Sequence, residues 1–157
     1  MKRLLRVLFF GFTLMELYLI GKRMSQKNNL FSRFIARWCK YKMNAQYGCY
    51  LSFKARISPD CKFIHPIGIV VGEGVTIESG CQIYQGVTFG AVNKDRDSSN
   101  RYPYVGSGAI IYAGAKVLGG IRIGSHAVIG ANSVVIRDVS DRAVVAGVPA
   151  RSITKNC

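Results

Sequence analysis

The 157 residues are enough for one domain with an apolar core and too few for two comfortable ones, so we expect a single folded body with an appendage. Hydrophobic residues make up 49% of the chain, which excludes a disordered or low-complexity protein. The net charge of +14 is uneven: residues 1–62 hold 13 Lys or Arg against two acids (+11), whereas residues 63–157 hold nine against six (+3). A basic, aromatic-rich appendage suits an anionic surface, and on charge alone this could be lipid or nucleic acid.

The five cysteines are an odd number without C-x-x-C spacing. This pattern favours free thiols in a reducing cytoplasm over a disulfide framework or a zinc cluster.

Residues 1–24, MKRLLRVLFFGFTLMELYLIGKRM, place a basic start before an apolar stretch, as a signal peptide does. No small-x-small cleavage site follows, and Glu16 interrupts the stretch well short of the roughly 20 apolar residues that a spanning helix needs. We therefore predict a helix that lies on a membrane surface.

Residues 28–43, NNLFSRFIARWCKYKM, show the pattern of a basic amphipathic helix. Apolar side chains recur at helical intervals at Leu30, Phe31, Phe34, Ile35 and Trp38, and Lys or Arg fills positions 33, 37, 40 and 42. Such a stripe either binds a membrane interface or forms a protein contact, with the protein's own body or with another subunit. Both interpretations stay open. No recognised nucleic-acid-binding motif accompanies the charge, so we expect no nucleic acid partner. Residues 1–48 form the predicted helical N-terminal region.

A repeat of six residues is the strongest pattern in the chain. Aliphatic residues return at Val105, Ile111, Val117, Ile123, Ile129 and Val135, with small or apolar residues four places later at Ala109, Ala115, Ile121, Ala127, Ser133 and Val139. The same period appears earlier at Ile57 and Phe63, and then at Val71, Ile77, Ile83 and Phe89, with Cys61 and Cys81 as small core residues. Three such hexads close one triangular coil, and stacked coils bury an aliphatic column.

The repeat loses phase twice. It shifts by two residues between Phe63 and Val71, where His65 lies, and it breaks over the polar, turn-rich stretch from Gly90 to Tyr104. A loop of that length in a regular solenoid is more often functional than accidental. We therefore divide the chain into the helical region 1–48, a β-helix at 49–151 with an extruded loop at 90–104, and a tail at 152–157.

Six motifs carry a resemblance to a known family: HPIGIVVGE at 65–73, QGVTFG at 85–90, NRYP at 100–103, GAKVLGGIRIG at 114–124, IGANSVV at 129–135 and AGVPAR at 146–151. They resemble the hexapeptide-repeat acyltransferases, in the branch of the serine acetyltransferases and the small capsular and exopolysaccharide O-acetyltransferases. The resemblance implies an all-β fold, the left-handed parallel β-helix. It also implies a homotrimer with acetyl-CoA as acetyl donor and active sites in grooves between subunits.

The resemblance assigns roles to individual residues. His65 aligns with the family's general base, whereas His126 occupies a regular turn and is expected to be structural. For acetyl-CoA it points to Gly90, Ala91, Ala113, Lys116, Ala131 and Arg151. We expect the acceptor to be bound by Glu73, Gln85, Arg101 and Tyr102.

Three departures from the serine acetyltransferases bear on the acceptor. Ile64 and Tyr50 stand where those enzymes keep Asp, and Tyr102 stands where they keep a second His. Because an aromatic face stacks on sugar CH groups, we predict an O-acetyltransferase for a sugar hydroxyl of a capsular, exopolysaccharide or O-antigen glycan. A divergent serine acetyltransferase and a catalytically decayed trimeric scaffold are the alternatives.

The remaining expectations concern metal, partners and location. Two histidines in the chain exclude a γ-carbonic anhydrase, which needs three zinc ligands, so no metal is expected. The predicted partners are two further copies of the chain, a glycan acceptor that could be lipid-linked, and a membrane surface. The predicted location is cytoplasmic, peripheral on the inner membrane.

Overall fold

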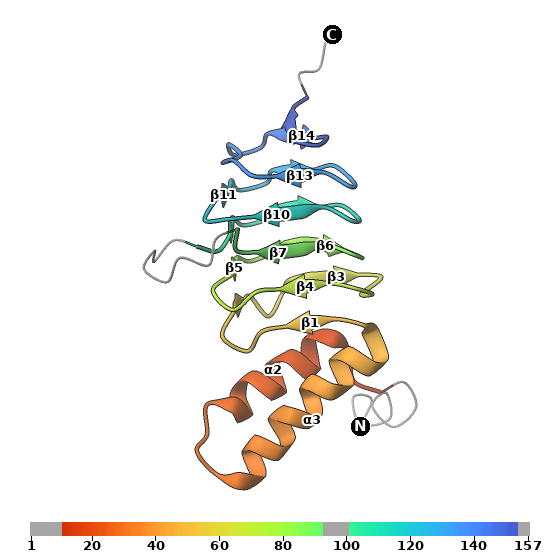
Figure 1. Cartoon of the computed structure of the whole chain (residues 1–157), viewed down its shortest axis with the longest axis vertical. Coiled ribbons are helices and arrows are strands. Elements are labelled where there is room, and N and C mark those ends of the chain that lie inside the picture. Colours follow the sequence, from red (N-terminus) through yellow and green to blue (C-terminus); the bar gives the residue numbers. More distant parts are fainter. Residues whose placement is uncertain (1–10, 93–100, 154–157) are drawn as a thin grey trace.

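The computed structural model describes residues 11–92 and 101–153, and it shows a three-sided, left-handed parallel coil standing on a pair of helices (Figure 1). Each side is a sheet whose neighbouring strands come from successive coils. Face A contains β1 (Tyr50–Leu51), β4 (Val70–Val71), β7 (Thr88–Gly90), β10 (Lys116–Leu118) and β13 (Val134–Val135). Face B contains β2 (Arg56–Ile57), β5 (Thr76–Ile77), β8 (Tyr104–Val105) and β11 (Arg122–Ile123). Face C contains β3 (Lys62–Ile64), β6 (Gln82–Tyr84), β9 (Ile110–Ile111), β12 (Val128–Ile129), β14 (Val144–Ala146) and β15 (Arg151–Ser152). All strand pairs are parallel except β14 with β15.

The inward column predicted from the hexads is confirmed. The six aliphatic residues from Val105 to Val135 are at most 2% exposed, and the cysteines at 61 and 81 lie in the same core. Phe63 and Ile121 are only partly buried, because each adjoins an irregular turn of the coil. The predicted fold class, a left-handed parallel β-helix with a helical appendage, is therefore correct.

The first loss of phase is an enlarged corner of the coil. Ile64 pairs with Tyr84 and Val70 pairs with Thr88, so residues 65–69 turn the corner that residues 85–87 turn one coil above. The two additional residues enlarge this corner, in which His65 and Ile67 are exposed while Ile69 stays in the core. The second loss of phase falls between β7 and β8, and residues 93–100 of the predicted loop lie outside the described residues.

Two helices close the lower end of the coil. The first, α2 (Leu14–Ser25), starts at a capping box in which Thr13 and Glu16 satisfy each other's backbone N–H groups. The second, α3 (Leu30–Tyr47), starts at Asn29 and ends at Gly48, whose φ of 59° is the left-handed conformation that glycine adopts freely.

The apolar side of α2 is packed inside the protein. Leu14, Leu17, Tyr18 and Gly21 are buried, and a side chain at Gly21 would collide with the Phe53 ring. This part of the expected membrane-surface helix therefore packs against the protein itself. No helix among residues 11–92 and 101–153 is long and apolar enough to cross a membrane.

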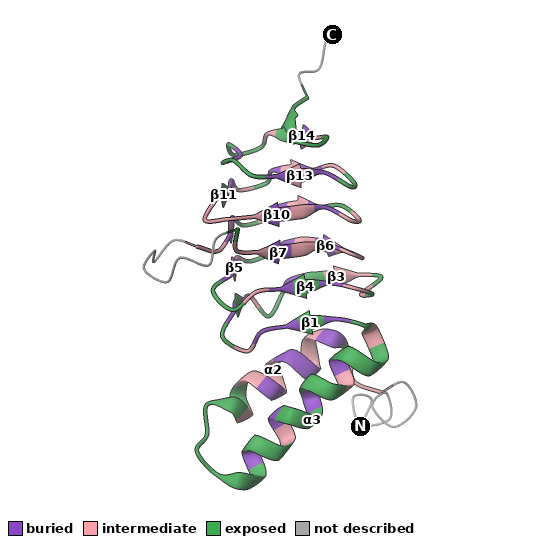
Figure 2. Cartoon of the chain, in the orientation of Figure 1, coloured by how far each residue is buried: buried purple, intermediate pink, exposed green. Residues whose placement is uncertain are grey.

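The aromatic stripe of α3 points away from the body. The buried residues of this helix are Ser32, Ala36, Cys39 and Met43, and the outward side is exposed along most of its length (Figure 2).

Candidate active site

Two edges of the coil carry the predicted site residues. We call the edge formed by turns from face C to face A the CA edge, and the edge formed by turns from face A to face B the AB edge. Figure 1 shows them on opposite sides of face A, with the β3–β4 turn on the right and the β7–β8 connection on the left.

His65 lies on the CA edge at the start of the enlarged corner. Its backbone has a φ of 47°, and its carbonyl accepts a hydrogen bond from the Ile67 amide at 2.7 Å. The side chain is exposed, and no hydrogen bond joins the imidazole to any residue in the described part of the chain. The structure thus presents the predicted base to the outside of the coil.

The CA turns stack directly on one another above His65. The Gly86 amide donates to the Ile67 carbonyl at 2.8 Å, and the Gly114 amide donates to the Gln85 carbonyl at 2.9 Å. The next step up is the Asn132 amide, which donates to the Ala113 carbonyl at 2.8 Å. His65, Gln85, Ala113 and Ala131 therefore follow each other along one edge.

Two tyrosines border this edge on face C. Tyr84 and Tyr112 lie immediately before Gln85 and Ala113, and their rings are in contact at a tilt of 38° with centroids 5.0 Å apart. Sequence reasoning missed them, although the repeated pattern Tyr-x-Gly in QIYQG and IIYAG was a signal for them.

The AB edge holds the second group of predicted residues. Glu73 forms an exposed ion pair with Lys54 at 3.1 Å, and the Gly90 carbonyl accepts a hydrogen bond from the Gly119 amide at 2.8 Å. Ala91 and Arg101 flank the loop that leaves this edge. Residues of the two groups cannot meet within one chain, because the whole width of face A separates the two edges.

Tyr102 is a packing residue on the AB edge. Its ring covers Gly72 and Gly74, and a Cβ at either glycine would fall within 3.0 Å of a ring carbon. The tyrosine is half-buried and packs against the hydrophobic core, so internal packing takes up the part of its ring that covers the two glycines. The two glycines on either side of Glu73 leave space for this ring, and they were the sequence feature that could have predicted its packing.

Lys116 lies on face A and its side chain reaches the CA edge, whereas Arg151 lies near the upper end of the coil. The Lys116 ammonium group, on face A, donates to the Gly86 carbonyl at 2.7 Å and to the Thr88 hydroxyl at 3.2 Å. Arg151 is exposed in β15, close to the upper end of the coil. Both remain predicted phosphate contacts.

The other predicted roles on the coil concern His126 and the residues beside the base. A side chain at Gly108 would collide with the His126 ring, so this histidine covers a glycine in the turn below it, as expected of a structural residue. Tyr50 lies on face A with the Lys40 ammonium group 4.9 Å from its ring centroid. Among residues 11–92 and 101–153, no three His, Cys, Asp or Glu side chains gather as a metal site would require.

Comparison with known proteins identifies the fold family. A family model described as bacterial transferase hexapeptide (six repeats) matches residues 102–137. The serine acetyltransferase of Haemophilus influenzae is 38% identical over 146 residues, which cover 93% of this chain and 53% of that protein. The solved structure of a serine acetyltransferase in complex with cysteine matches with a TM-score of 0.82 at 37% identity, covering 96% of this chain and 58% of that one. Residues 102–137 are therefore hexapeptide repeats of the kind that the family model describes.

The resemblance to the acyltransferase branch is thereby confirmed. A serine acetyltransferase structure in complex with CoA also matches, with a TM-score of 0.77 and 36% identity over 89% of this chain and 56% of that one. The chain spans about half the length of the curated relatives it matches.

The predicted glycan acceptor is wrong. The relatives and structures reported above are serine acetyltransferases, and the alternative of a divergent serine O-acetyltransferase fits them better than capsule or polysaccharide biosynthesis does. The prediction failed at Tyr102, which was assigned to sugar stacking but packs over Gly72 and Gly74.

Proposed function

We propose that this protein is an acetyl-CoA-dependent O-acetyltransferase that acetylates the hydroxyl group of serine and works as a homotrimer. The observation that carries the proposal is the single edge on which His65, Gln85, Ala113 and Ala131 follow each other, in a fold shared with serine acetyltransferases. His65 lies at the lower end of this edge, and small residues follow above it. This arrangement suits acetyl-CoA, whose thioester lies at the end of a long, thin pantetheine arm.

The chemistry follows from this arrangement. The His65 imidazole takes the proton of the serine hydroxyl while the oxygen attacks the thioester carbonyl. The carbon–sulfur bond then breaks, the coenzyme A thiolate leaves, and the proton returns to it from the imidazolium. Ala113 and Ala131 leave room for the pantetheine arm, and Arg151 and Lys116 supply positive charge for the phosphates.

The acceptor end requires a second copy of the chain. His65 lies on the CA edge and Arg101 on the AB edge, so one site can use both only if the CA edge of one copy faces the AB edge of the next. A guanidinium group is suited to a carboxylate, which it binds with two parallel hydrogen bonds, and serine offers one. Exposed apolar side chains along the CA edge, including Ile67 at 67% and Val148 at 73%, favour such a contact.

The first test is the reaction itself. The purified protein is incubated with acetyl-CoA and L-serine, with release of free thiol and formation of O-acetylserine as readouts. We expect both in the intact protein, and loss of both in the variant His65→Asn. The matched control is His126→Asn, because both histidines are exposed with positive φ (47° and 58°) but lie on different edges. Thiol release without O-acetylserine would reject serine, and failure to bind acetyl-CoA would reject the whole proposal.

The second test concerns the shared site. A trimer has three times the chain mass of 17.3 kDa, about 52 kDa, which light scattering measures. When inactive His65→Asn and inactive Arg101→Ala chains assemble together at random, about one site in four combines an intact histidine with an intact arginine. We therefore expect about a quarter of the normal activity in the mixture. If trimers that contain both variant chains are inactive, then His65 and Arg101 act in a site formed by one chain, or one of the two residues does not belong to the site.

A further inference from the structure

The outward side of α3 is a continuous apolar surface. We call Leu30, Phe31, Phe34, Trp38 and Tyr41 the α3 stripe; Leu30, Phe31, Phe34 and Tyr41 are 83%, 73%, 67% and 67% exposed, and Trp38 is 37% exposed. Isolated exposed apolar residues are ordinary, but five bulky ones along one side of one helix form a patch of the kind that marks a binding surface.

The stripe cannot be covered by the body on which α3 packs. An α-helix turns about 100° per residue, so the stripe lies on the opposite side of α3 from the buried residues Ser32, Ala36, Cys39 and Met43. The buried side faces α2 and the first coil, and Figure 2 shows the exposed side of α3 directed away from both. Phe12 partly covers Trp38, and only something outside the described residues can cover the rest of the stripe.

The charge around the stripe identifies the kind of partner. Arg33, Arg37, Lys40 and Lys42 lie on α3, which contains no acidic residue at all. Residues 11–48 together hold seven Lys or Arg against one Glu, a net charge of +6. A second copy of this surface would bring the same positive charge, whereas an anionic lipid headgroup is complementary to it.

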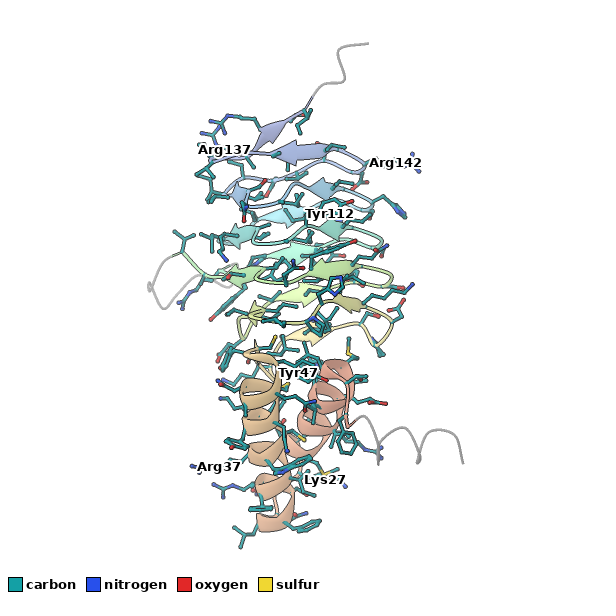
Figure 3. All side chains as sticks on the ribbon, turned by 90° about the vertical axis from the view of Figure 1, so that its right-hand side faces the viewer. Lys27, Arg37, Tyr47, Tyr112, Arg137 and Arg142 are labelled. Carbon is teal, nitrogen blue, oxygen red and sulfur yellow. The ribbon has the colours of Figure 1, made fainter. Side chains whose placement is uncertain are left out.

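We propose that the α3 stripe docks the protein onto an anionic phospholipid membrane. Aromatic side chains insert at the level of the headgroups, and the flanking basic side chains contact lipid phosphates. The helical pair forms one end of the molecule, where Lys27 and Arg37 project outward (Figure 3). Docking through this end leaves the two edges of the coil in solution, so the inference is independent of the proposed acetyl transfer.

The protein contains its own reporter for this contact. Trp38 is the single tryptophan of the chain and lies at the border of the stripe, with its ring edge-on to Phe12 at 6.1 Å and the Lys42 ammonium group 5.8 Å from its centroid. The full chain is mixed with phosphatidylglycerol vesicles and, separately, with phosphatidylcholine vesicles. We expect a blue shift of Trp38 emission, and quenching by brominated acyl chains, with the anionic vesicles only.

Substitutions in the stripe separate its contribution from that of the basic, apolar residues 1–10. Phe31→Ser and Phe34→Ser each remove an exposed ring, and we expect each to weaken the partition coefficient at least about tenfold. Arg37→Gln should weaken it about fivefold, and rising salt should remove this difference. The matched controls are Ile153→Ser and Arg137→Gln, exposed residues at the opposite end of the coil, which should leave partitioning unchanged.

Three results would overturn the proposal. The first is that anionic vesicles neither shift nor quench Trp38. The second is that vesicle binding survives in Phe31→Ser and Phe34→Ser, which would assign it to residues 1–10. The third is that these substitutions lower the melting temperature or the molecular mass of the protein in the absence of lipid, because the stripe would then be covered by this chain or by another copy.

Discussion

Gly74 should not tolerate a methyl group, because the Tyr102 ring occupies the space that the methyl group needs. A Cβ built on Gly74 lies 2.9 Å from Cγ of Tyr102 and closer still to Cδ2, whereas carbon atoms in contact are about 3.5–4.0 Å apart. The ring must therefore shift by almost an ångström or leave its position over the glycines. Since the φ of Gly74 lies outside the left-handed region, the backbone itself accepts alanine, and the clash alone decides the outcome.

The expected magnitude follows from the general cost of overpacking. Inserting a methyl group into a packed contact costs about 1–3 kcal/mol, whereas a Gly→Ala change without a clash stabilises by about 0.4–1 kcal/mol. Gly74→Ala should therefore lower the melting temperature by about 3 °C for each kcal/mol lost. In a Tyr102→Ala background, where the ring is gone, the same substitution should be neutral or stabilising. The stability change should thus reverse sign between the two backgrounds.

Thermal unfolding followed by circular dichroism, at one fixed protein concentration, measures all four members of this cycle. Gly90→Ala is the matched stability control, because its Cβ would meet only Leu118 Cδ2, at an ordinary 3.7 Å. In the acetyl-transfer assay, Gly74→Ala should raise the KM for serine more than it lowers kcat, since Arg101 adjoins the displaced ring. An equal loss of stability in both backgrounds would refute the packing argument.

The remaining predictions concern catalysis, the core and alkaline pH. His65→Asn should lower kcat at least about a hundredfold and leave the melting temperature unchanged, because the side chain is exposed and Asn accepts a positive φ; a smaller kinetic effect would remove His65 from the role of base. Ile111→Ala should destabilise by about 2–5 kcal/mol in chemical denaturation, whereas Ile136→Ala, at a half-exposed position, should cost little; equal costs would contradict the inward column. Burial raises the pKa of Tyr18 from 10.0 to about 12 and raises the pKa of four thiols above 9.0. The folded protein therefore favours the protonated forms, so stability should be complete below about pH 9 and fall as pH rises through the folded-state pKa values. Thermal melts at pH 8 and pH 10.5 measure this loss, and a melting temperature that rises between them would reverse the sign of the argument.

The coil itself was predictable from the sequence because its order is local. Each hexad contributes one inward aliphatic residue, as Ile111 and Val117 do, and neighbouring coils repeat the same contact, so the six-residue period contains nearly all the information about the fold. The phase slip at His65 was equally readable, since two additional residues in a regular repeat must lengthen a corner. The acyltransferase resemblance followed from the order of the motifs along the chain.

The environments of Tyr102 and the α3 stripe depended on the tertiary structure. Tyr102 follows a loop, and its ring direction is set by two glycines about 30 residues earlier that lie beside it only after the coil has closed. For α3 the sequence showed that the helix has two sides, but helical periodicity does not say which side meets the body. That choice is made by small residues, Ala36 and Cys39 among them, which allow α2 to approach closely. The larger aromatic side chains of the stripe are left on the outside, where a partner can reach them.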